Sequence, residues 1–396
     1  MITPMHYRRF GQTELNMPVL TCGGMRYQQS WQDIAPQDLD RKIQENVAAT
    51  IHAAFNAGIN HIETARGYGS SEYHLGFVLP ELPRQQIIVQ TKIGPKASES
   101  EFRKTFEISL QHLRLSHVDL LSIHGVNTRD LLNQSLEKGS LKACRKLQNE
   151  GLVRHVGFST HAPLDVILDA INTGEFSYVN LHWYFFDQQN WPAIQAAQAR
   201  DMGLFIISPN DKGGKLYAPP EKLKKLCAPL TPMALNDLFC LSHPEVHTLS
   251  IGAARPTDFD AHLAALPHVE TPWPVMDPIL KRLHEEGLRC LGEDWWMHWN
   301  EGLPPLVYVP QELPLYHILR LYNLAKAFDM TAYGQMRYNL LGGADHWFPG
   351  NKAVDIDQQK LAAALQHYRF ASQIPDRLRE AHALLNGEDK KRLSQS

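Results

Sequence analysis

The stretch HIETARGYGSSEYHLG, residues 61–76, begins with a short strand pattern and continues into a turn bracketed by glycines. It follows AAFNAGIN, which has the pattern of an amphipathic helix that ends at Gly58. A helix that leads directly into a strand is one step of an alternating α/β chain. The stretch also places Glu63 shortly before Tyr68, and the question is whether these two residues form a chemical site or an ordinary turn.

Further apolar runs alternate with helical patterns on both sides of this stretch. The eight predicted strands are VLTCGG (19–24), HIETA (61–65), IIVQTKI (87–93), DLLSIHG (119–125), RHVGFST (154–160), YVNLHWY (178–184), LFIISP (204–209) and HTLSIGA (247–253). Most are continuously hydrophobic, which is typical of parallel strands buried on both faces. The helical patterns between them include residues 46–58, 100–115, 136–151 and 163–174. This alternation over roughly 250 residues predicts an α/β fold, a closed (β/α)8 TIM barrel.

An open, doubly wound sheet is the alternative fold. No GxGxxG motif follows the first predicted strand, which disfavours that alternative.

The strand pattern stops near residue 270. The segment TPWPVMDP, residues 271–278, indicates a proline-rich connection, and helical patterns follow at 314–328, 357–370 and 375–385. The run DWWMHW, residues 294–299, favours a packed segment over a free tail because large aromatic side chains are usually buried. We therefore expect two domains, a barrel over residues 1–270 and a helical C-terminal extension over residues 271–396 that packs on it.

The composition excludes several classes of function. The chain has 396 residues and a formal net charge of −3, so nothing suggests binding to nucleic acid or to an acidic membrane surface. No secretory signal and no membrane-length apolar run is apparent. The five cysteines are odd in number, far apart and without a CxxC motif, which argues for a reducing cytoplasm and against a metal site held by thiolates.

In a barrel of this kind the active site lies at the carboxyl ends of the strands. The polar residues expected at that rim come from six strands or the loops that follow them: Glu63, Tyr68, Lys92, His124, Ser159, Thr160, Asn180 and Ser208. A lone lysine near a strand end is most often solvated, and a lone histidine in a buried strand is most often hydrogen-bonded within the core. Together on one rim, however, Tyr68, Lys92 and His124 suit proton transfer to a carbonyl oxygen. Lys92 would lower the pKa of Tyr68 and Glu63 would hold Lys92 by an ion pair.

These motifs, taken in order, resemble the aldo-keto reductase family of (β/α)8 oxidoreductases that use NADPH or NADH. The resemblance covers roughly residues 5–268. It rests on YRRFGQTELNMPVLTCGGM, GINHIETARGYGSSEYHLG, QTKIG, LLSIHG, VRHVGFST, FIISPNDKGGKL and TLSIGAARPTDFDAHL. It implies that Tyr68 donates the proton, Lys92 depresses its pKa, His124 orients the substrate and Glu63 supports Lys92. The family usually has aspartate at the position of Glu63.

The resemblance also implies a set of cofactor-binding residues: Gly24, Met25, Ser159, Thr160, Asn180, Ile207, Ser208, Lys215, Gly252, Arg255, Asp258 and His262. Arg255 is suited to a 2′-phosphate, although Asp258 stands where NADPH-preferring relatives often have a basic residue. NADPH is therefore the favoured cofactor and NADH the alternative. The expected partner is a small carbonyl compound, and the expected state is a monomer or a small homo-oligomer.

Two further expectations concern the substrate pocket and the extension. Tyr27, Trp31 and Trp183 are candidates to line the pocket, while packing beneath the extension is an equally good interpretation of these aromatic residues. The extension, notably GGADHWFPGNKA and PDRLREAHALL, resembles a bacterial branch of the family whose tail carries a ferredoxin-like iron–sulfur segment. Only Cys290 lies in that region and a cluster needs about four thiolates, so we expect no cluster and no other metal.

Three alternatives to an active reductase remain open. A regulatory, nucleotide-binding barrel with vestigial redox activity is one, although the presence of Tyr68, Lys92 and His124 favours an enzyme. A metal-dependent hydrolase would need a His-x-His pair on an early strand, which HIE does not supply. A Schiff-base aldolase built on Lys92 would leave Tyr68 unexplained.

Overall fold

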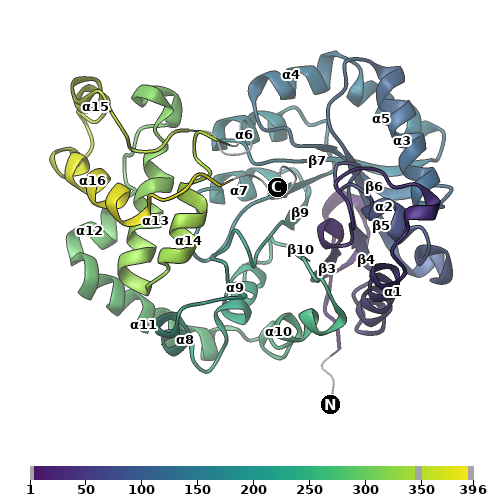
Figure 1. Cartoon of the computed structure of the whole chain (residues 1–396), viewed down its shortest axis with the longest axis horizontal. Coiled ribbons are helices and arrows are strands. Elements are labelled where there is room, and N and C mark those ends of the chain that lie inside the picture. The colour runs from purple at the N-terminus through teal and green to yellow at the C-terminus, as the bar shows by residue number, and fades with distance from the viewer. Residues whose placement is uncertain (1–3, 344–349, 391–396) are drawn as a thin grey trace. The chain divides into compact units, whose positions relative to one another are not determined.

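The computed structural model describes residues 4–343 and 350–390. The chain forms two compact units. The first contains residues 1–213 and 233–272, and the second contains residues 214–232 and 273–396 (Figure 1). The predicted division at residue 270 into two domains stays a prediction, and the second unit also includes a short segment from within the predicted barrel. Part of the GGADHWFPGNKA stretch, residues 344–349, lies outside the described residues.

The first unit is built on a closed parallel barrel, which confirms the predicted fold. Its strands are β3 (Leu20–Gly23), β4 (His61–Glu63), β5 (Ile88–Ile93), β6 (Val118–His124), β7 (Val153–Ser159), β8 (Tyr178–Leu181), β9 (Gly203–Ile206) and β10 (Thr248–Ile251). They pair in chain order, and β10 closes the barrel on β3. All eight predicted strands are present because each is an apolar run that the barrel and its helices bury on both faces.

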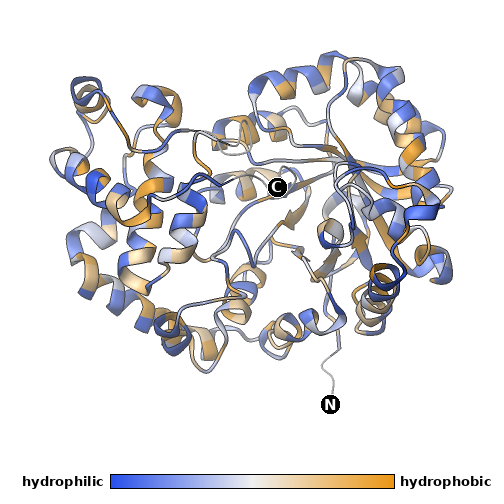
Figure 2. Ribbon diagram, in the orientation of Figure 1, coloured by the Kyte–Doolittle hydropathy of each residue, from blue (hydrophilic) through white to orange (hydrophobic). Residues whose placement is uncertain are grey.

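Helices surround this barrel and cover its outer face (Figure 1). They are α1 (Arg41–Asn56), α2 (Ser71–Leu75), α3 (Glu99–Leu113), α4 (Arg129–Glu137), α5 (Ser140–Asn149), α6 (Leu164–Asn172), α7 (Trp191–Gln198), α9 (Pro232–Leu241) and α10 (Asp260–Leu263). Several begin at a side-chain cap. The Ser98 hydroxyl, for example, accepts a hydrogen bond from the Glu101 amide at the start of α3. Figure 2 shows the apolar strands enclosed by helices whose outward faces are largely hydrophilic.

A hairpin covers the amino-terminal end of the barrel. Its strands are β1 (Tyr7–Arg9) and β2 (Asn16–Pro18), which pair antiparallel. The hairpin and the barrel interior share one buried cluster, formed by Phe10, Leu15, Met17, Ile88, Leu120, Tyr178 and Phe205.

The second unit is helical. Its helices are α8 (Glu221–Cys227), α11 (Trp273–Leu291), α12 (Glu293–His298), α13 (Leu315–Phe328), α14 (Thr331–Tyr338), α15 (Gln358–Ala364) and α16 (Ile374–Leu385). The central helix, α13, packs against α11, α14 and α16. It is buried on almost every side, as expected for a helix that is hydrophobic all round.

One predicted segment of this unit is wrong. Residues 271–278 were expected to form an irregular connection, but α11 already begins at Trp273. Pro274 falls in the first turn of α11, where a missing backbone N–H breaks no helical hydrogen bond. Pro278 lies inside the helix, and the buried residues Met276, Ile279 and Leu283 hold the segment helical despite it.

Trp295 of the DWWMHW run is packed, as expected, whereas Met297 of the same run is exposed. The Trp295 side chain is buried, donates a hydrogen bond from Nε1 to Asn323 Oδ1 at 2.9 Å and lies under the Arg377 guanidinium, 3.6 Å from the ring centroid. Within the described ranges, no helix is both long enough and apolar enough to cross a bilayer.

Candidate active site

Four side chains that the sequence singled out meet at the carboxyl ends of β4, β5 and β6. Glu63 is the last residue of β4, and Lys92 lies on β5 with its side chain directed into the barrel. The Lys92 ammonium contacts the Glu63 carboxylate directly. The same Nζ atom lies 3.2 Å from the Tyr68 hydroxyl and 2.8 Å from the backbone oxygen of Thr64. The fourth side chain is that of His124, the last residue of β6, whose ring packs edge-on against Tyr68 at a centroid distance of 5.7 Å.

The charged side chains of this group are shielded from water. Lys92 is 1% exposed and Glu63 is 3% exposed. Burial lowers the pKa of Lys92 well below its ordinary value, whereas contact with the Glu63 carboxylate works in the opposite direction because it favours the ammonium form. Burial also raises the pKa of the Tyr68 hydroxyl. The expected lowering of the Tyr68 pKa by Lys92 is therefore outweighed in this structure, and Tyr68 is a protonated phenol at neutral pH.

The neighbouring strand accommodates the glutamate. Gly23 on β3 pairs with Glu63 in the barrel register. A Cβ atom on Gly23 would lie 2.6 Å from Ser250 Oγ and 3.4 Å from Glu63 Oε2. The Ser250 hydroxyl in turn donates to Glu63 Oε2 at 3.4 Å. The absence of a side chain at position 23 therefore leaves room for the longer carboxylate to reach Lys92.

Three of the predicted cofactor residues lie side by side at the ends of β7 and β8. Ser159 pairs with Asn180 in the barrel register, and the Thr160 amide donates to the Asn180 backbone oxygen. The Ser159 hydroxyl accepts from the Gly125 amide at 3.2 Å, and the Thr160 hydroxyl donates to the backbone oxygen of Val126 at 2.7 Å. The Thr160 hydroxyl therefore ties the end of β7 to the loop after β6.

Asn180 differs from Ser159 and Thr160 because its side-chain amide makes no hydrogen bond to the described residues. The Asn180 side chain is fully buried, and neither its Oδ1 nor its Nδ2 atom has a hydrogen-bond partner among the described residues. A buried amide without partners is costly unless a ligand supplies them. The donor and acceptor of Asn180 thus fit a ligand that carries an amide of its own, such as a nicotinamide ring.

The remaining predicted cofactor residues follow β3, β9 and β10. Gly24 and Met25 form a 3-10 turn after β3, where a Cβ atom on Gly24 would lie 2.6 Å from the Glu63 backbone oxygen. Ile207 and Ser208 directly follow β9. Gly252 directly follows β10, and Arg255, Asp258 and His262 lie further along the same segment.

Arg255 and Asp258 form an ion pair on the surface. Arg255 Nε lies 2.9 Å from Asp258 Oδ1, and Asp258 Oδ2 accepts from the Ala254 amide. The Arg255 side chain is 72% exposed, so its guanidinium is accessible to a phosphate. His262 is instead buried, with its Nδ1 atom against the Asp237 carboxylate and its Nε2 atom 3.3 Å from Asn210 Nδ2.

The structure does not bring every predicted residue to this site. Tyr27 is fully buried and its hydroxyl contacts the Cys22 thiol at 2.8 Å, so it does not line an open pocket. Trp183 is also buried, packed against Trp191 and Phe239. Both aromatic residues are therefore packed within the barrel unit, and their packing beneath the extension stays a prediction. Lys215 belongs to the second unit, where it lines a small cavity with Asp329 and Tyr333.

Trp31, in contrast, lies next to the Tyr68 turn. A Cβ atom on Gly69 would lie 2.0 Å from the backbone oxygen of Ser30 and 2.6 Å from Trp31 Cα. The loop after β3 and the turn that carries Tyr68 are therefore in close contact.

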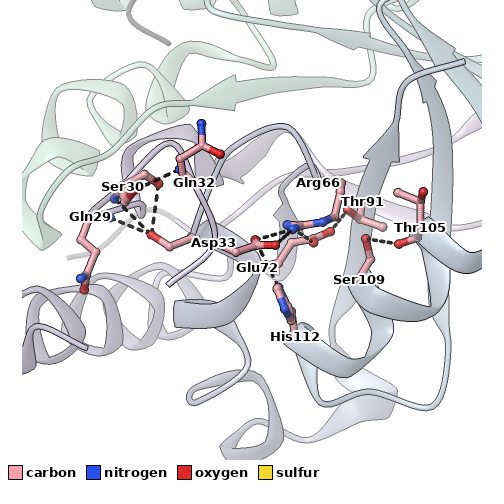
Figure 3. A network of polar contacts seen from close by, with 11 residues as sticks. Gln29, Ser30, Gln32, Asp33, Arg66, Glu72, Thr91, Thr105, Ser109 and His112 are labelled. Carbon is pink, nitrogen blue, oxygen red and sulfur yellow. Dashed lines mark hydrogen bonds and ion pairs between the residues drawn. The ribbon is translucent and has the colours of Figure 1, made fainter. Parts of the chain in front are cut away.

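Sequence reasoning missed two polar clusters at this end of the barrel. One joins Asp33, Arg66, Glu72 and Thr91 (Figure 3). The other follows β7, β8 and β9, where Lys212 Nζ lies 3.0 Å from His161 Nδ1 and 3.4 Å from His182 Nε2. Neither cluster could be found from the sequence, because its members come from different loops and have no regular spacing along the chain. Arg66 and Glu72 do, however, flank Tyr68 in the sequence.

The fold and this site define an oxidoreductase barrel whose tyrosine is paired with a buried lysine and carboxylate. The model of the aldo/keto reductase family matches residues 19–218, and the chain belongs to this family. Among relatives, the chain is 25% identical over 302 residues to an L-galactose dehydrogenase of Arabidopsis thaliana, a match that covers 68% of the chain and 91% of the relative. It is 28% identical over 199 residues to an NADH-specific methylglyoxal reductase of Escherichia coli, covering 44% of the chain and 59% of the relative.

Solved structures agree on the fold. An aldo-keto reductase from Bacillus halodurans in its holo form superimposes with a TM-score of 0.58 at 21% identity, covering 70% of the chain and 96% of that structure. An aldo-keto reductase from Klebsiella pneumoniae in complex with NADPH gives a TM-score of 0.56 at 17% identity, covering 70% of the chain and 95% of that structure.

Proposed function

We propose that this protein reduces the carbonyl group of a small aldehyde or ketone with NADPH or NADH, and that Tyr68 donates the proton. The observation that carries the proposal is the arrangement around the Tyr68 hydroxyl. It lies 3.2 Å from Lys92 Nζ, which contacts Glu63, and the ring of Tyr68 packs against His124.

Each side chain has a role that follows from its position. Tyr68 is protonated at neutral pH and gives its proton to the carbonyl oxygen as negative charge develops there. The Lys92 ammonium stabilises the phenolate that this transfer leaves behind, and Glu63 keeps Lys92 charged. His124 orients the carbonyl oxygen towards Tyr68 by hydrogen bonding. A bound nicotinamide nucleotide supplies the hydride.

The residues at the barrel rim fit such a nucleotide. The unpartnered amide of Asn180, next to the Ser159 hydroxyl, supports a carboxamide-binding role for these two residues. We further assign Gly24, Met25, Thr160, Ile207, Ser208, Gly252, Arg255, Asp258 and His262 to cofactor binding, as the family resemblance implies.

We favour NADPH because the exposed guanidinium of Arg255 is suited to a 2′-phosphate. NADH is the alternative because Asp258 neutralises that guanidinium, and one relative is named as NADH-specific. We also propose that the protein works in the cytoplasm as a monomer or small homo-oligomer.

The first test is a fluorescence titration with NADPH and NADH, followed by turnover of a panel of aldehydes, ketones and quinones. We expect at least one nucleotide to bind and at least one activated carbonyl compound to be reduced. Tyr68→Phe should lower kcat by about 10²- to 10⁴-fold, the usual contribution of a positioned acid, with the cofactor Kd unchanged. A protein that binds neither nucleotide is not a reductase, and a Tyr68→Phe variant with unchanged kcat has another proton donor.

A further inference from the structure

An ionic network joins the loop after β3, the segment from Arg66 to Glu72 and strand β5 (Figure 3). Arg66 Nη1 lies 3.5 Å from Glu72 Oε2, and Arg66 Nη2 contacts both oxygens of Asp33. The other oxygen of Glu72 accepts from the Thr91 hydroxyl at 2.5 Å. One guanidinium therefore holds two carboxylates that come from different segments of the chain.

The network brackets the proton donor and its lysine. Arg66 lies two residues before Tyr68, and its backbone amide donates to the backbone oxygen of Lys92 at 2.9 Å. Glu72 lies on α2, which begins three residues after Tyr68. Thr91 is the residue before Lys92 on β5, so its side chain points to the outside of the barrel while that of Lys92 points inward. The Arg66–Glu72–Thr91 chain thus ties both ends of the Tyr68 turn to the strand that carries Lys92.

The second arm of the network reaches the loop after β3. Besides the Arg66–Asp33 contact, the Ser70 amide donates to the Ser30 backbone oxygen at 2.9 Å, and the Ser70 hydroxyl accepts from the Gln29 amide at 3.0 Å. Gly69 lets Trp31 approach the turn closely. Residues 29–33, and with them Trp31, are therefore fastened to the Tyr68 turn.

Arg66 is the cation that pairs with both carboxylates of the network, Glu72 and Asp33. Glu72 is 0% exposed and Arg66 is its cationic partner, while the side chain of Arg66 is 18% exposed. The groups that face Glu72 from the neighbouring elements are Thr91 on β5, Ser109 on α3 and Asp33 beyond Arg66. Burial raises the pKa of Glu72, and Arg66 opposes that rise. His112 on α3 lies 4.0 Å from Asp33.

We propose that Arg66 is a positioning residue for the proposed reduction: through Glu72 it fixes the Tyr68 hydroxyl relative to Lys92, and through Asp33 it fixes the loop with Trp31 against the substrate. The proposal rests on the proposed function for its kinetic readout. The two contacts of Arg66 predict different kinetic effects. The contact with Glu72 positions a reacting group, Tyr68, whereas the contact with Asp33 positions a binding surface.

The first test compares the two arms by steady-state kinetics at pH 7. Arg66→Met should lower kcat at least tenfold with the cofactor Kd unchanged, and Arg66→Lys should recover part of that loss because it keeps the charge. Asp33→Asn should raise KM for the carbonyl substrate severalfold with kcat within about twofold of the wild type. Arg103→Met is the matched control, because Arg103 is an arginine of α3 in ion pairs with Glu107 and Glu150, and it should change neither constant.

The second test measures the Arg66–Glu72 ion pair through the pH dependence of protein stability and needs no turnover. Without Arg66, the pKa of Glu72 rises further, so the folded state holds the Glu72 proton more tightly than the unfolded state does. The stability of Arg66→Met relative to the wild type should therefore fall as pH rises above the ordinary range of a glutamate and through the raised pKa of Glu72, because the unfolded state ionises while the folded state resists. Burial and Arg66 both lower the pKa of His112, so the loss of Arg66 also lets that pKa rise and adds to the trend. Arg66→Met/Glu72→Gln carries the same change at His112, so urea midpoints should fall more steeply with pH in Arg66→Met than in the double variant, and the difference reports Glu72.

The outcomes separate this proposal from the proposed function. If Arg66→Met keeps the wild-type kcat, or if Asp33→Asn lowers kcat as much as Arg66→Met does, the positioning role is overturned. The same holds if the urea midpoints of Arg66→Met follow the wild type at every pH. A wild-type protein that reduces no carbonyl compound overturns the proposed function instead, and with it the kinetic role of Arg66, while the pH trend still tests the ion pair.

Discussion

Glu63 is longer by one methylene than the aspartate usual in the family, and the structure gives a reason why it is accommodated. Its carboxylate reaches Lys92 on one side and Ser250 on the other, in space that Gly23 leaves open. The pair is buried, so each charge depends on the other much more than a surface ion pair would. Lys92 is therefore the group whose charge should respond most to a change at position 63.

Glu63→Gln should shift the alkaline limb of the kcat profile to lower pH. Removing the carboxylate leaves burial unopposed, so the pKa of Lys92 falls further and the ammonium is lost at a lower pH. Because Tyr68 stays protonated, its own titration does not set this limb. The measurement is kcat against pH for the wild type and Glu63→Gln, with a displacement of at least about one pH unit expected. Superimposable profiles would show that Glu63 does not control the charge of Lys92.

At the scale of elements, the barrel register decides which side chains share the site. Parallel pairing sets Gly23 on β3 beside Glu63 on β4, and Ser159 on β7 beside Asn180 on β8. Alternation along β5 sends Lys92 inward and Thr91 outward to Glu72. A substitution at one of these paired positions should therefore affect the site by displacing the paired residue on the neighbouring strand.

Gly23→Ala should lower both stability and activity. Its new methyl group would lie 2.6 Å from Ser250 Oγ, so overpacking should reduce the free energy of unfolding by about 1–3 kcal/mol and displace Glu63 from Lys92. Urea denaturation and kcat report the two effects. Gly343→Ala is the control and should be nearly silent, because among the described residues its Cβ atom would meet only the Leu340 backbone oxygen, at 3.9 Å, and its φ is ordinary. The double variant Gly23→Ala/Ser250→Ala should recover only part of the stability, because the new Cβ atom would still lie 3.0 Å from the Ile251 backbone oxygen. No recovery at all would argue against the clash with Ser250.

At the scale of the whole molecule, the chain consists of a barrel unit and a helical unit with separate cores. The helical unit is held by α13 at its centre and by the Trp295 side chain, which contacts Asn323, Phe370 and Arg377. Its stability should therefore depend on a few large buried groups rather than on a bound cluster.

Trp295→Ala should reduce the free energy of unfolding of the helical unit by about 3–5 kcal/mol, the usual loss for a buried aromatic side chain. Denaturation followed by hydrogen exchange in residues 273–343 would measure it. Met297→Ala, on the same helix but exposed, should change the same quantity by less than about 0.5 kcal/mol. Equal effects of the two substitutions would contradict a role for Trp295 in the core.

Much of this protein was determined by its sequence alone. The eight apolar runs predicted the barrel strands because a strand buried on both faces must be continuously hydrophobic, and strand ends predicted that Glu63, Lys92 and His124 would share a rim with Tyr68. Sequence patterns failed where distant segments decide the outcome. Neighbouring apolar residues keep 273–278 helical despite two prolines, Tyr27 and Trp183 are enclosed by packing, and burial rather than Lys92 sets the direction of the Tyr68 pKa. Only the tertiary structure brings Asp33, Arg66, Glu72 and Thr91 together, because burial and charge pairing depend on which segments meet and leave no periodic signal in the chain.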